Sequence, residues 1–193
     1  MTPRPYRLGR RQAAVDRTRA RILKAARALL VARDAADFSI ESVARRARVT
    51  RATVYQRFGS RPKLLEALFD DLARGGGMSD LAEAFRQLDP DLALERFVAA
   101  FGRFWTAHRP IHRRLLALGA LDSGLERTLR ARQEWRRQGL RAIVSRMRAP
   151  EETIDLLFAL TSFQTFDLLA GPKRTPAAVT PMVLRAARAV LGL

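Results

Sequence analysis

The sequence has 193 residues, no cysteine, and 36 Lys/Arg against 19 Asp/Glu, which gives a formal net charge of +17. The absence of cysteine excludes disulfides and thiolate metal sites. Residues 1–63 hold 17 basic and four acidic residues, a net charge of +13, whereas the other 130 residues hold 19 and 15. Positive charge concentrated in the first third of the chain indicates a polyanion as the partner of that part.

The N-terminal segment MTPRPYRLGRR is basic, contains proline and glycine, and leads into no apolar segment. No uninterrupted apolar run approaches membrane-spanning length. We therefore expect a cytoplasmic protein without a membrane partner, in which residues 1–17 form a basic arm. The arm is either a solvated tail or a DNA contact that uses Arg4, Arg7, Arg10 and Arg11 along phosphates or in the minor groove.

Three helices are expected in residues 18–58. Apolar residues at helical spacing predict the first helix, after a cap at Asp16 or Thr18. Ser39 is expected to cap the segment IESVARRA, and Thr50 to cap a third helix that Gly59 ends. The apolar stripe of the first helix consists of Ile22, Ala26, Leu29 and Leu30.

The rest of the chain also has helical patterning, and we find no strand-like alternation of useful length. Ser60 is expected to cap a fourth helix that buries its leucines, and the segment RGGGMSD at 74–80 predicts a linker. The fold class is therefore all-α, with domains at 18–73 and 78–193. Further helices are expected at about 80–87, 90–107, 110–120, 122–148, 151–170 and 176–191.

Two short helices joined by a tight turn, the second with an exposed polar face, predict a helix-turn-helix. Val54 and Phe58 lie one helical turn apart, so they share the face that packs inward. The opposite face carries hydroxyl, guanidinium and amide groups, which bind phosphates and base edges. In this motif the second helix enters the major groove of DNA.

The segments SIESVA, ARVT, TVYQRFGSR and LLEAL occur in this order, and residues 18–70 resemble the N-terminal domain of TetR-family transcriptional regulators. The resemblance implies base-facing Arg51, Ala52 and Tyr55, although Tyr55 could instead pack between helices. It places Ser39 and Arg61 at the sugar-phosphate backbone. The expected DNA-binding residues are Ser39, Thr50, Arg51, Ala52, Thr53, Tyr55, Gln56, Arg57 and Arg61. Where the family often has glycine before the recognition helix, this chain has Arg48, so either a left-handed backbone there carries a modest penalty or the turn differs slightly.

Aromatic residues cluster in two helices of the C-terminal part. They are either ordinary core or, as the resemblance implies, part of a pocket for a small and mainly apolar or aromatic effector. The expected effector-binding residues are Phe101, Phe104, Trp105, His108, Phe158, Thr161 and Gln164. His108 and His112 have an i, i+4 spacing, but Pro110 lies between them and no carboxylate is placed as a further ligand, so we expect neither a metal nor a cofactor.

The region from about 151 to 191 is apolar over broad faces and contains small residues at Ala186, Ala187 and Ala189. The resemblance implies a homodimer through this region, as a four-helix bundle. The alternative is that the terminal helix packs within its own chain.

The leading hypothesis is a dimeric repressor that binds double-stranded DNA at a palindromic operator and is released by its effector. The alternative is a largely non-specific, nucleoid-associated DNA-binding protein. We expect no enzyme activity, because the sequence contains no G-x-x-x-x-G-K-[ST], G-x-S-x-G or H-E-x-x-H motif.

Overall fold

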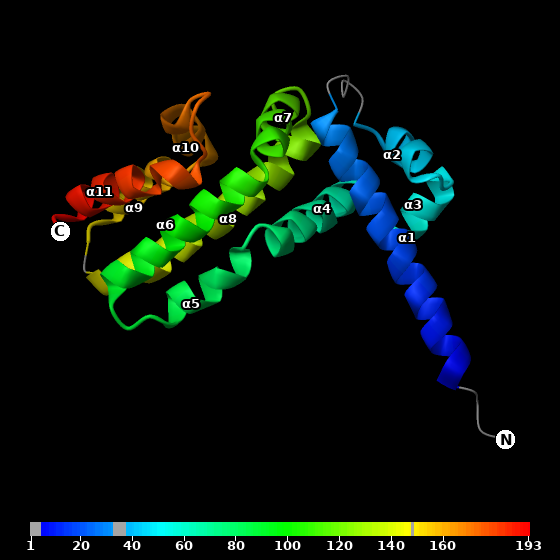
Figure 1. The fold of residues 1–193 in the computed structure, drawn as a ribbon, viewed down its shortest axis with the longest axis horizontal. Coiled ribbons are helices and arrows are strands. Elements are labelled where there is room, and N and C mark those ends of the chain that lie inside the picture. The colour runs from blue at the N-terminus through cyan, green and yellow to red at the C-terminus, as the bar shows by residue number, and fades with distance from the viewer. Residues whose placement is uncertain (1–4, 33–37, 148) are drawn as a thin grey trace. The chain divides into compact units, whose positions relative to one another are not determined.

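The computed structural model describes residues 5–32, 38–147 and 149–193, and every regular element in these ranges is a helix (Figure 1). The predicted all-α class is therefore confirmed. The chain divides into two compact units, Met1–Asp71 and Leu72–Leu193. The division lies inside helix α4 (Arg61–Gly75), ahead of the segment predicted as a linker.

The first helix, α1 (Pro5–Val31), begins well before the predicted caps, so the predicted start near Asp16 or Thr18 is wrong. Both residues lie inside the helix: the Thr18 hydroxyl donates to the Ala14 carbonyl, and the Asp16 carboxylate accepts from the Gln12 amide. Proline is tolerated in the first turn and arginine is a good helix former, which explains the extension. Residues 5–17 of the predicted arm are thus helical, and residues 1–4 lie outside the described ranges.

The helix-turn-helix is confirmed as α2 (Ile40–Ala47), a tight turn, and α3 (Arg51–Phe58). The turn contains Arg48 at φ 52 and ψ 49, the one residue other than glycine with positive φ among the described residues. Its amide and that of Val49 bond back to carbonyls of the last turn of α2, as at a helix end that normally uses glycine. Of the two alternatives considered at Arg48, the left-handed backbone is therefore the one present.

The first unit has an apolar core supplied by all four of its helices. Val54 is 0% exposed and Phe58 6%, so α3 is held by the two residues that the helical spacing places inward. Gly59, at φ 78, then ends α3 without steric strain. The other largest contributors are Ile22, Leu23 and Leu30 of α1, Phe38, Ile40 and Val43 around α2, and Leu64, Leu65 and Leu68 of α4.

The segment 74–80, predicted as an irregular linker, is instead structured. Helix α4 runs to Gly75, and a 3-10 turn, η1 (Met78–Asp80), follows. Gly76 is buried, and a Cβ atom there would lie 2.5 Å from Cδ2 of Phe104. The glycine therefore permits close packing against the next long helix, a role that sequence composition alone does not distinguish from flexibility.

The second unit is a bundle around α6 (Pro90–Ala107), which contacts most of the helices of the unit (Figure 1). Asp89 caps α6 and Asp122 caps α8, each accepting from backbone amides of the first turn. The neighbouring elements are α5 (Leu81–Arg86), α7 (Arg109–Gly119), α8 (Ser123–Val144) and η2 (Ser145–Met147).

The helix predicted over 151–170 is two helices, α9 (Glu151–Leu160) and α10 (Phe163–Ala170), bent by 46°. Ser162 caps α10 by accepting from the Thr165 amide. The break frees the Thr161 carbonyl, which accepts from the Trp105 indole at 3.3 Å. No single described helix is long and apolar enough to cross a membrane; α9 and α10 meet that test of length and composition only when taken together.

The chain continues through η3 (Ala177–Val179) into α11 (Thr180–Leu191), which packs on α6 and α9. The Arg188 guanidinium donates to both Asp91 carboxylate oxygens, at 2.8 and 2.7 Å, and to Glu95 at 3.0 Å. Val183, Leu184 and Ala187 are buried within the same chain. Intrachain packing of the terminal helix, the alternative considered for its apolar face, therefore accounts for these three residues.

Candidate DNA-binding surface and ligand groove

The exposed face of α3 carries most of the residues expected to bind DNA. Thr50, Arg51, Ala52, Tyr55 and Gln56 are exposed, whereas Thr53 and Arg57 are half-buried. Tyr55 is 40% exposed, so its ring is not enclosed between helices. The helix thus presents hydroxyl, guanidinium, amide and methyl groups on one surface, which are the groups that contact phosphates and base edges.

Arg51 and Tyr55 lie one helical turn apart and contact each other. Arg51 Nη2 donates to the Tyr55 hydroxyl at 3.4 Å, and the guanidinium carbon is 5.6 Å from the ring centroid. The hydrogen bond from Arg51 raises the pKa of its guanidinium, so this group is cationic at any physiological pH. The pair orders a cation and a phenol on the face that would meet DNA.

Two of the expected DNA-binding hydroxyls cap helices. The Ser39 hydroxyl accepts from the Ser42 amide at 3.1 Å, and the Thr50 hydroxyl accepts from the Thr53 amide at 3.1 Å. Each cap satisfies a backbone donor that the first helical turn leaves unpaired. Ser39 and Thr50 therefore begin α2 and α3 whether or not they also contact a phosphate.

Arg61, expected at a phosphate, holds two elements of the first unit together. Its Nε and Nη2 donate to the Phe38 carbonyl at 3.3 and 3.1 Å, and its guanidinium lies 5.8 Å from the Phe38 ring centroid. These contacts join the start of α4 to the residue before the α2 cap. Arg57, at the end of α3, has a buried Nε without a hydrogen-bond partner.

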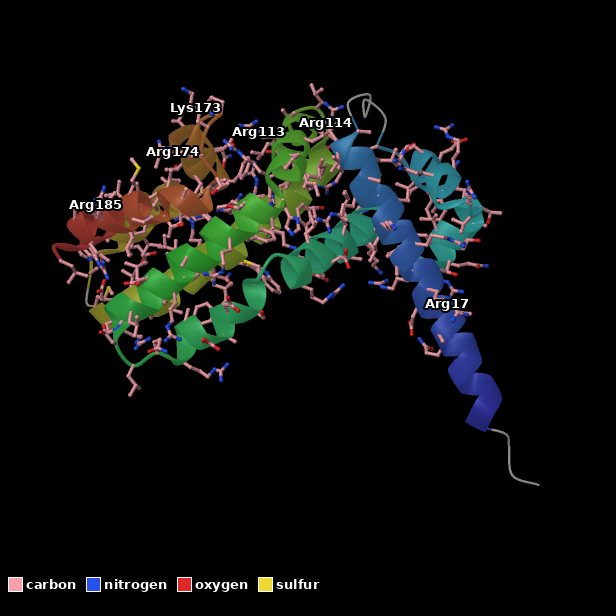
Figure 2. The ribbon with its side chains drawn as sticks, viewed as in Figure 1. Arg17, Arg113, Arg114, Lys173, Arg174 and Arg185 are labelled. Atoms are coloured by element: carbon pink, nitrogen blue, oxygen red, sulfur yellow. The ribbon has the colours of Figure 1, made fainter. Side chains whose placement is uncertain are left out.

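Helix α1 adds positive charge to the first unit. Arg17 projects from this helix (Figure 2), and the Arg19 guanidinium lies 4.8 Å from the Phe58 ring centroid. The exposed cations of its described side chains are Arg17, Arg19, Arg21 and Lys24. These four charges therefore lie on a surface, as expected for a part of the chain that meets a polyanion.

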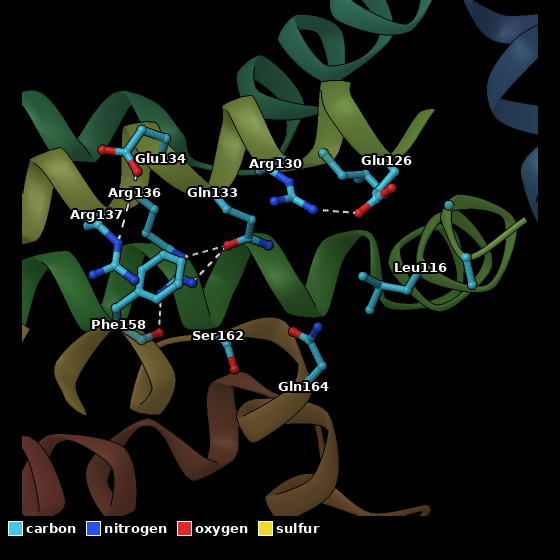
Figure 3. A pocket seen from close by; sticks show the side chains of 13 residues that line it. Leu116, Glu126, Arg130, Gln133, Glu134, Arg136, Arg137, Phe158, Ser162 and Gln164 are labelled. Atoms are coloured by element: carbon cyan, nitrogen blue, oxygen red, sulfur yellow. Dashed lines mark hydrogen bonds and ion pairs between the residues drawn. The ribbon is translucent and has the colours of Figure 1, made fainter. Parts of the chain in front are cut away.

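A groove of about 820 Å³ lies among α7, α8, α9 and α10 (Figure 3). Leu116, Gly119, Ala120 and Leu129 form an apolar part of its lining. The rest of the lining is polar or charged, apart from the Phe158 ring. These residues are Glu126, Arg130, Gln133, Glu134, Arg136, Arg137, Ser162 and Gln164.

Of the residues expected to bind an effector, Phe158 and Gln164 line this groove. The others are buried in a packed cluster beside it, in which Trp105 contacts both Phe101 and Phe104 with ring centroids 5.5 and 5.0 Å apart. The buried residues are Phe101, Phe104, Trp105, His108 and Thr161.

His108 and His112 both belong to this aromatic cluster. His108 Nε2 lies 2.8 Å from the Leu72 carbonyl oxygen. His112 Nε2 has no hydrogen-bond partner, and burial together with the nearby His108 lowers the pKa of His112 to about 3. Among the residues that the structure describes, no three His, Asp or Glu side chains are grouped to hold a metal ion.

Sequence reasoning missed Arg136 and Gln133, which lie side by side in the groove (Figure 3). Arg136 is 4% exposed and occupies the buried stripe of α8, four residues before Leu140. The sequence does contain one signal for Arg136: a charged residue stands at a position of α8 where the helical spacing predicts a buried one. Arginine is almost never fully buried unless it is paired, so such a position indicates a partner or a ligand.

Comparisons with known proteins agree with this architecture. Residues 22–68 match the sequence model of the family described as bacterial regulatory proteins, tetR family. No curated protein matches the sequence.

Solved structures share the fold along almost the whole chain. A transcriptional regulator from Rhodococcus sp. RHA1 is 20% identical, with 90% of this chain and 94% of that chain covered and a TM-score of 0.62. The TetR-family regulator PfmR from Thermus thermophilus is 24% identical, with coverages of 86% and 94% and a TM-score of 0.59. RolR in complex with resorcinol is 20% identical, with coverages of 93% and 95% and a TM-score of 0.51.

The match covers α2 and α3 with parts of α1 and α4, and the exposed polar face of α3 lies within it. The solved structures share the fold of the chain. Residues 22–68 therefore form a domain of the kind found in bacterial regulatory proteins of the tetR family.

Proposed function

We propose that the protein is a homodimeric, sequence-specific repressor that binds a palindromic operator and releases it when a small effector binds the second unit. The observation that carries this proposal is the polar face of α3, which is exposed while Val54 and Phe58 fix the opposite face in the core. A recognition helix must be held rigidly by one face while the other remains free to enter the major groove.

The base contacts are assigned to Arg51, Ala52 and Tyr55, with Thr53 beside them. Arg51 has the fork of donors that matches the guanine O6 and N7 acceptors, and the Ala52 methyl can contact a thymine methyl. Gln56 and Arg57 lie nearer the end of α3 and are assigned to phosphates. Ser39 and Thr50 keep their capping bonds and present their remaining hydrogen-bonding capacity to the backbone of DNA, and Arg61 is assigned to the same backbone as a cation.

The dimer surface is proposed along α9, α10 and α11, within the range 151–191. Leu156 is 54% exposed and Leu168 82%, and Ala189 is also exposed. Large exposed leucines on adjacent helices are costly in a monomer, and a symmetric contact between two copies would remove them from water. A dimer is also what spaces two recognition helices by about one turn of DNA, roughly 34 Å.

The effector site is proposed in the groove among α7 to α10, with Phe158 and Gln164 in its lining. The buried aromatic cluster forms the wall behind the groove: the Trp105 indole donates to the Thr161 carbonyl, and the Thr161 hydroxyl contacts the groove residue Arg136. RolR, which has the same fold, was solved with resorcinol, an aromatic ligand of the size this groove admits. Effector binding shifts DNA affinity only if the ligand prefers one of two conformations.

The test is a selection of bound sequences from random double-stranded DNA with the full chain. We expect enrichment of a palindrome whose half-sites are about one helical turn, or a multiple of it, apart. A bound pool with no enriched sequence, in spite of tight and salt-sensitive binding, would instead identify a non-specific nucleoid-associated protein.

A further inference from the structure

We infer that the groove binds an organic acid, with its carboxylate on Arg136 and its apolar body against the surface that contains Leu116 and Leu129. The inference rests on the proposed function, because it names the chemical class of the effector in that same groove. It departs from the apolar effector expected from the sequence, because the lining contains a buried cation.

Arg136 is held by neutral groups, among them the Phe158 ring, whose centroid lies 3.9 Å from the guanidinium carbon. Its Nη1 donates to the Phe158 carbonyl at 2.6 Å and to the Thr161 hydroxyl at 2.5 Å. Its Nε and Nη2 both donate to the Gln133 amide oxygen, at 3.2 and 2.8 Å. No carboxylate of the described residues forms an ion pair with Arg136, although its side chain is 4% exposed.

The other charged groups of the groove are already paired. Arg130 Nη2 is 2.6 Å from a Glu126 carboxylate oxygen, and Arg137 pairs with Asp155 and lies 4.0 Å from Glu134 (Figure 3). The Arg136 charge is therefore the uncompensated one. Burial, and then the nearby charge of Arg137, lower the pKa of Arg136 to about 9, so the group is still cationic at neutral pH. A buried cation without a counter-ion favours any anion that can reach it.

The Gln133 amide marks where the anion binds. Its oxygen occupies the Nε–Nη2 edge of Arg136, the edge on which a carboxylate makes two parallel hydrogen bonds. An amide and a carboxylate are planar groups of the same size, so a ligand carboxylate can replace the amide without disturbing the bonds from Nη1. Gln133 is half-buried and lines the groove, which lets its side chain turn aside.

The remainder of the groove fits an apolar body. Leu116, Gly119 and Ala120 of the α7 end lie with Leu129 of α8 in the same lining. At Gly119 an added Cβ would be 2.8 Å from Leu129 Cδ1, so Leu129 packs directly on Gly119 and the two form one apolar surface. Ser162 and Gln164 line the opposite wall and offer a hydroxyl and an amide (Figure 3). The lining thus selects a molecule with one acidic end and one apolar end.

The experiment measures thermal unfolding and binding isotherms of the full chain with benzoate, 3-phenylpropionate and 2-naphthoate, each beside its own amide. We expect at least one carboxylate to raise Tm with concentration and to bind about tenfold or more tightly than its amide, because charge-assisted hydrogen bonds are the stronger ones. If no carboxylate binds better than its matched amide, the inference is overturned.

A second experiment uses a variant whose own side chain supplies the carboxylate that is expected to bind Arg136. Gln133→Glu should raise Tm without ligand and abolish the response to the carboxylates, because the new side chain occupies the Arg136 edge. Gln138→Glu makes the same change at an exposed position of α8 outside the groove lining, and it should leave the response intact. A folded Gln133→Glu variant that responds like the wild type would contradict the assignment of Arg136.

Operator affinity measured on the same samples separates the two proposals. If the carboxylates bind through Arg136 but leave DNA affinity unchanged, the organic-acid site stands and its role as an effector site fails. If the protein binds an operator but no carboxylate binds better than its amide, the organic-acid inference fails and the regulator stands.

Discussion

His108 Nε2 lies 2.8 Å from the backbone carbonyl oxygen of Leu72. Leu72 belongs to the last turn of α4, where the final four carbonyls have no partner inside the helix. His108 follows the last residue of α6, so one imidazole ends α4 and fixes its last turn to the centre of the second unit. The nearby Gly76 permits this approach, because a Cβ there would lie 3.0 Å from His108 Nε2.

His108→Leu should destabilise the protein by about 1–3 kcal/mol, because it leaves the buried Leu72 carbonyl without a donor. His108→Gln keeps an Nε2 donor at a similar distance along the side chain, so it should lose less stability than His108→Leu. Urea unfolding of the three proteins gives the comparison. Equal losses for the leucine and glutamine variants would show that packing, and not the hydrogen bond, determines the effect.

Arg48→Gly should stabilise the first unit by up to about 1 kcal/mol. The left-handed backbone costs arginine about 1–2 kcal/mol, and the added freedom of glycine in the unfolded chain offsets part of the gain. The matched control is Arg46→Gly, two residues earlier and inside α2, which should lower the free energy of unfolding by about 1 kcal/mol. Thermal unfolding that ranks the two variants in the opposite order would contradict the strain at Arg48.

Acidification should destabilise the second unit through His112. Its folded pKa of about 3 lies below the ordinary 6.5, so the unfolded chain binds more protons between these values and stability falls as pH falls. The loss from His112 between pH 7 and pH 5 should be about 2 kcal/mol. His112→Phe retains a ring among Phe104, Trp105 and Phe163 and should remove most of this pH dependence. Urea unfolding at pH 7, 6 and 5 measures the free energy of unfolding of both proteins. If this free energy falls with pH as steeply in the variant as in the wild type, groups other than His112 cause the loss of stability.

Leu168→Asp should weaken the proposed dimer by about tenfold or more, because it places a carboxylate in an apolar contact. The control is Leu121→Asp, which changes an equally exposed leucine outside α9 to α11. Sedimentation equilibrium reports the dimer dissociation constant of each protein. If Leu168→Asp remains as dimeric as the control, the subunits associate through another surface.

Local signals made the DNA-binding unit predictable from the sequence. Ser39, Thr50 and Gly59 act within one helical turn of their own position, and the spacing of Val54 and Phe58 identifies the buried face of α3. The early start of α1 was missed because arginine and an initial proline suit a helix as well as they suit a solvated arm.

Long-range contacts limited the prediction of the second unit. The break at Thr161 depends on Trp105 and Arg136, which are far away in sequence, and within the segment itself only Ser162 marks it. The groove is formed by four helices, so no local pattern locates it. Phe158 and Gln164 could be proposed from the sequence because an aromatic ring and an amide are typical of ligand pockets. Arg136 could not, because its burial depends on which face of α8 packs inward.

Arg51→Ala should reduce discrimination between operator and random DNA by about 1–3 kcal/mol, because Arg51 is assigned a bidentate base contact. Arg61→Ala should weaken binding to all sequences alike, and it should also lower stability because it breaks two bonds to the Phe38 carbonyl. Unfolding curves of Arg61→Ala show how much of its loss of DNA affinity comes from unfolding of the protein. A loss of sequence discrimination in Arg61→Ala would place that residue, and not Arg51, at a base.

The most direct test of the account is the affinity of wild type and Arg51→Ala for the selected operator and for a scrambled duplex of equal length, measured by fluorescence anisotropy at one salt concentration. The control variant is Arg127→Ala, which removes an exposed arginine of the second unit. Arg51→Ala should bind the operator roughly 5- to 150-fold more weakly than wild type, with a much smaller change on the scrambled duplex, while Arg127→Ala should match wild type on both. Equal losses of Arg51→Ala on the two duplexes would contradict the claim that the exposed face of α3 recognises the DNA sequence.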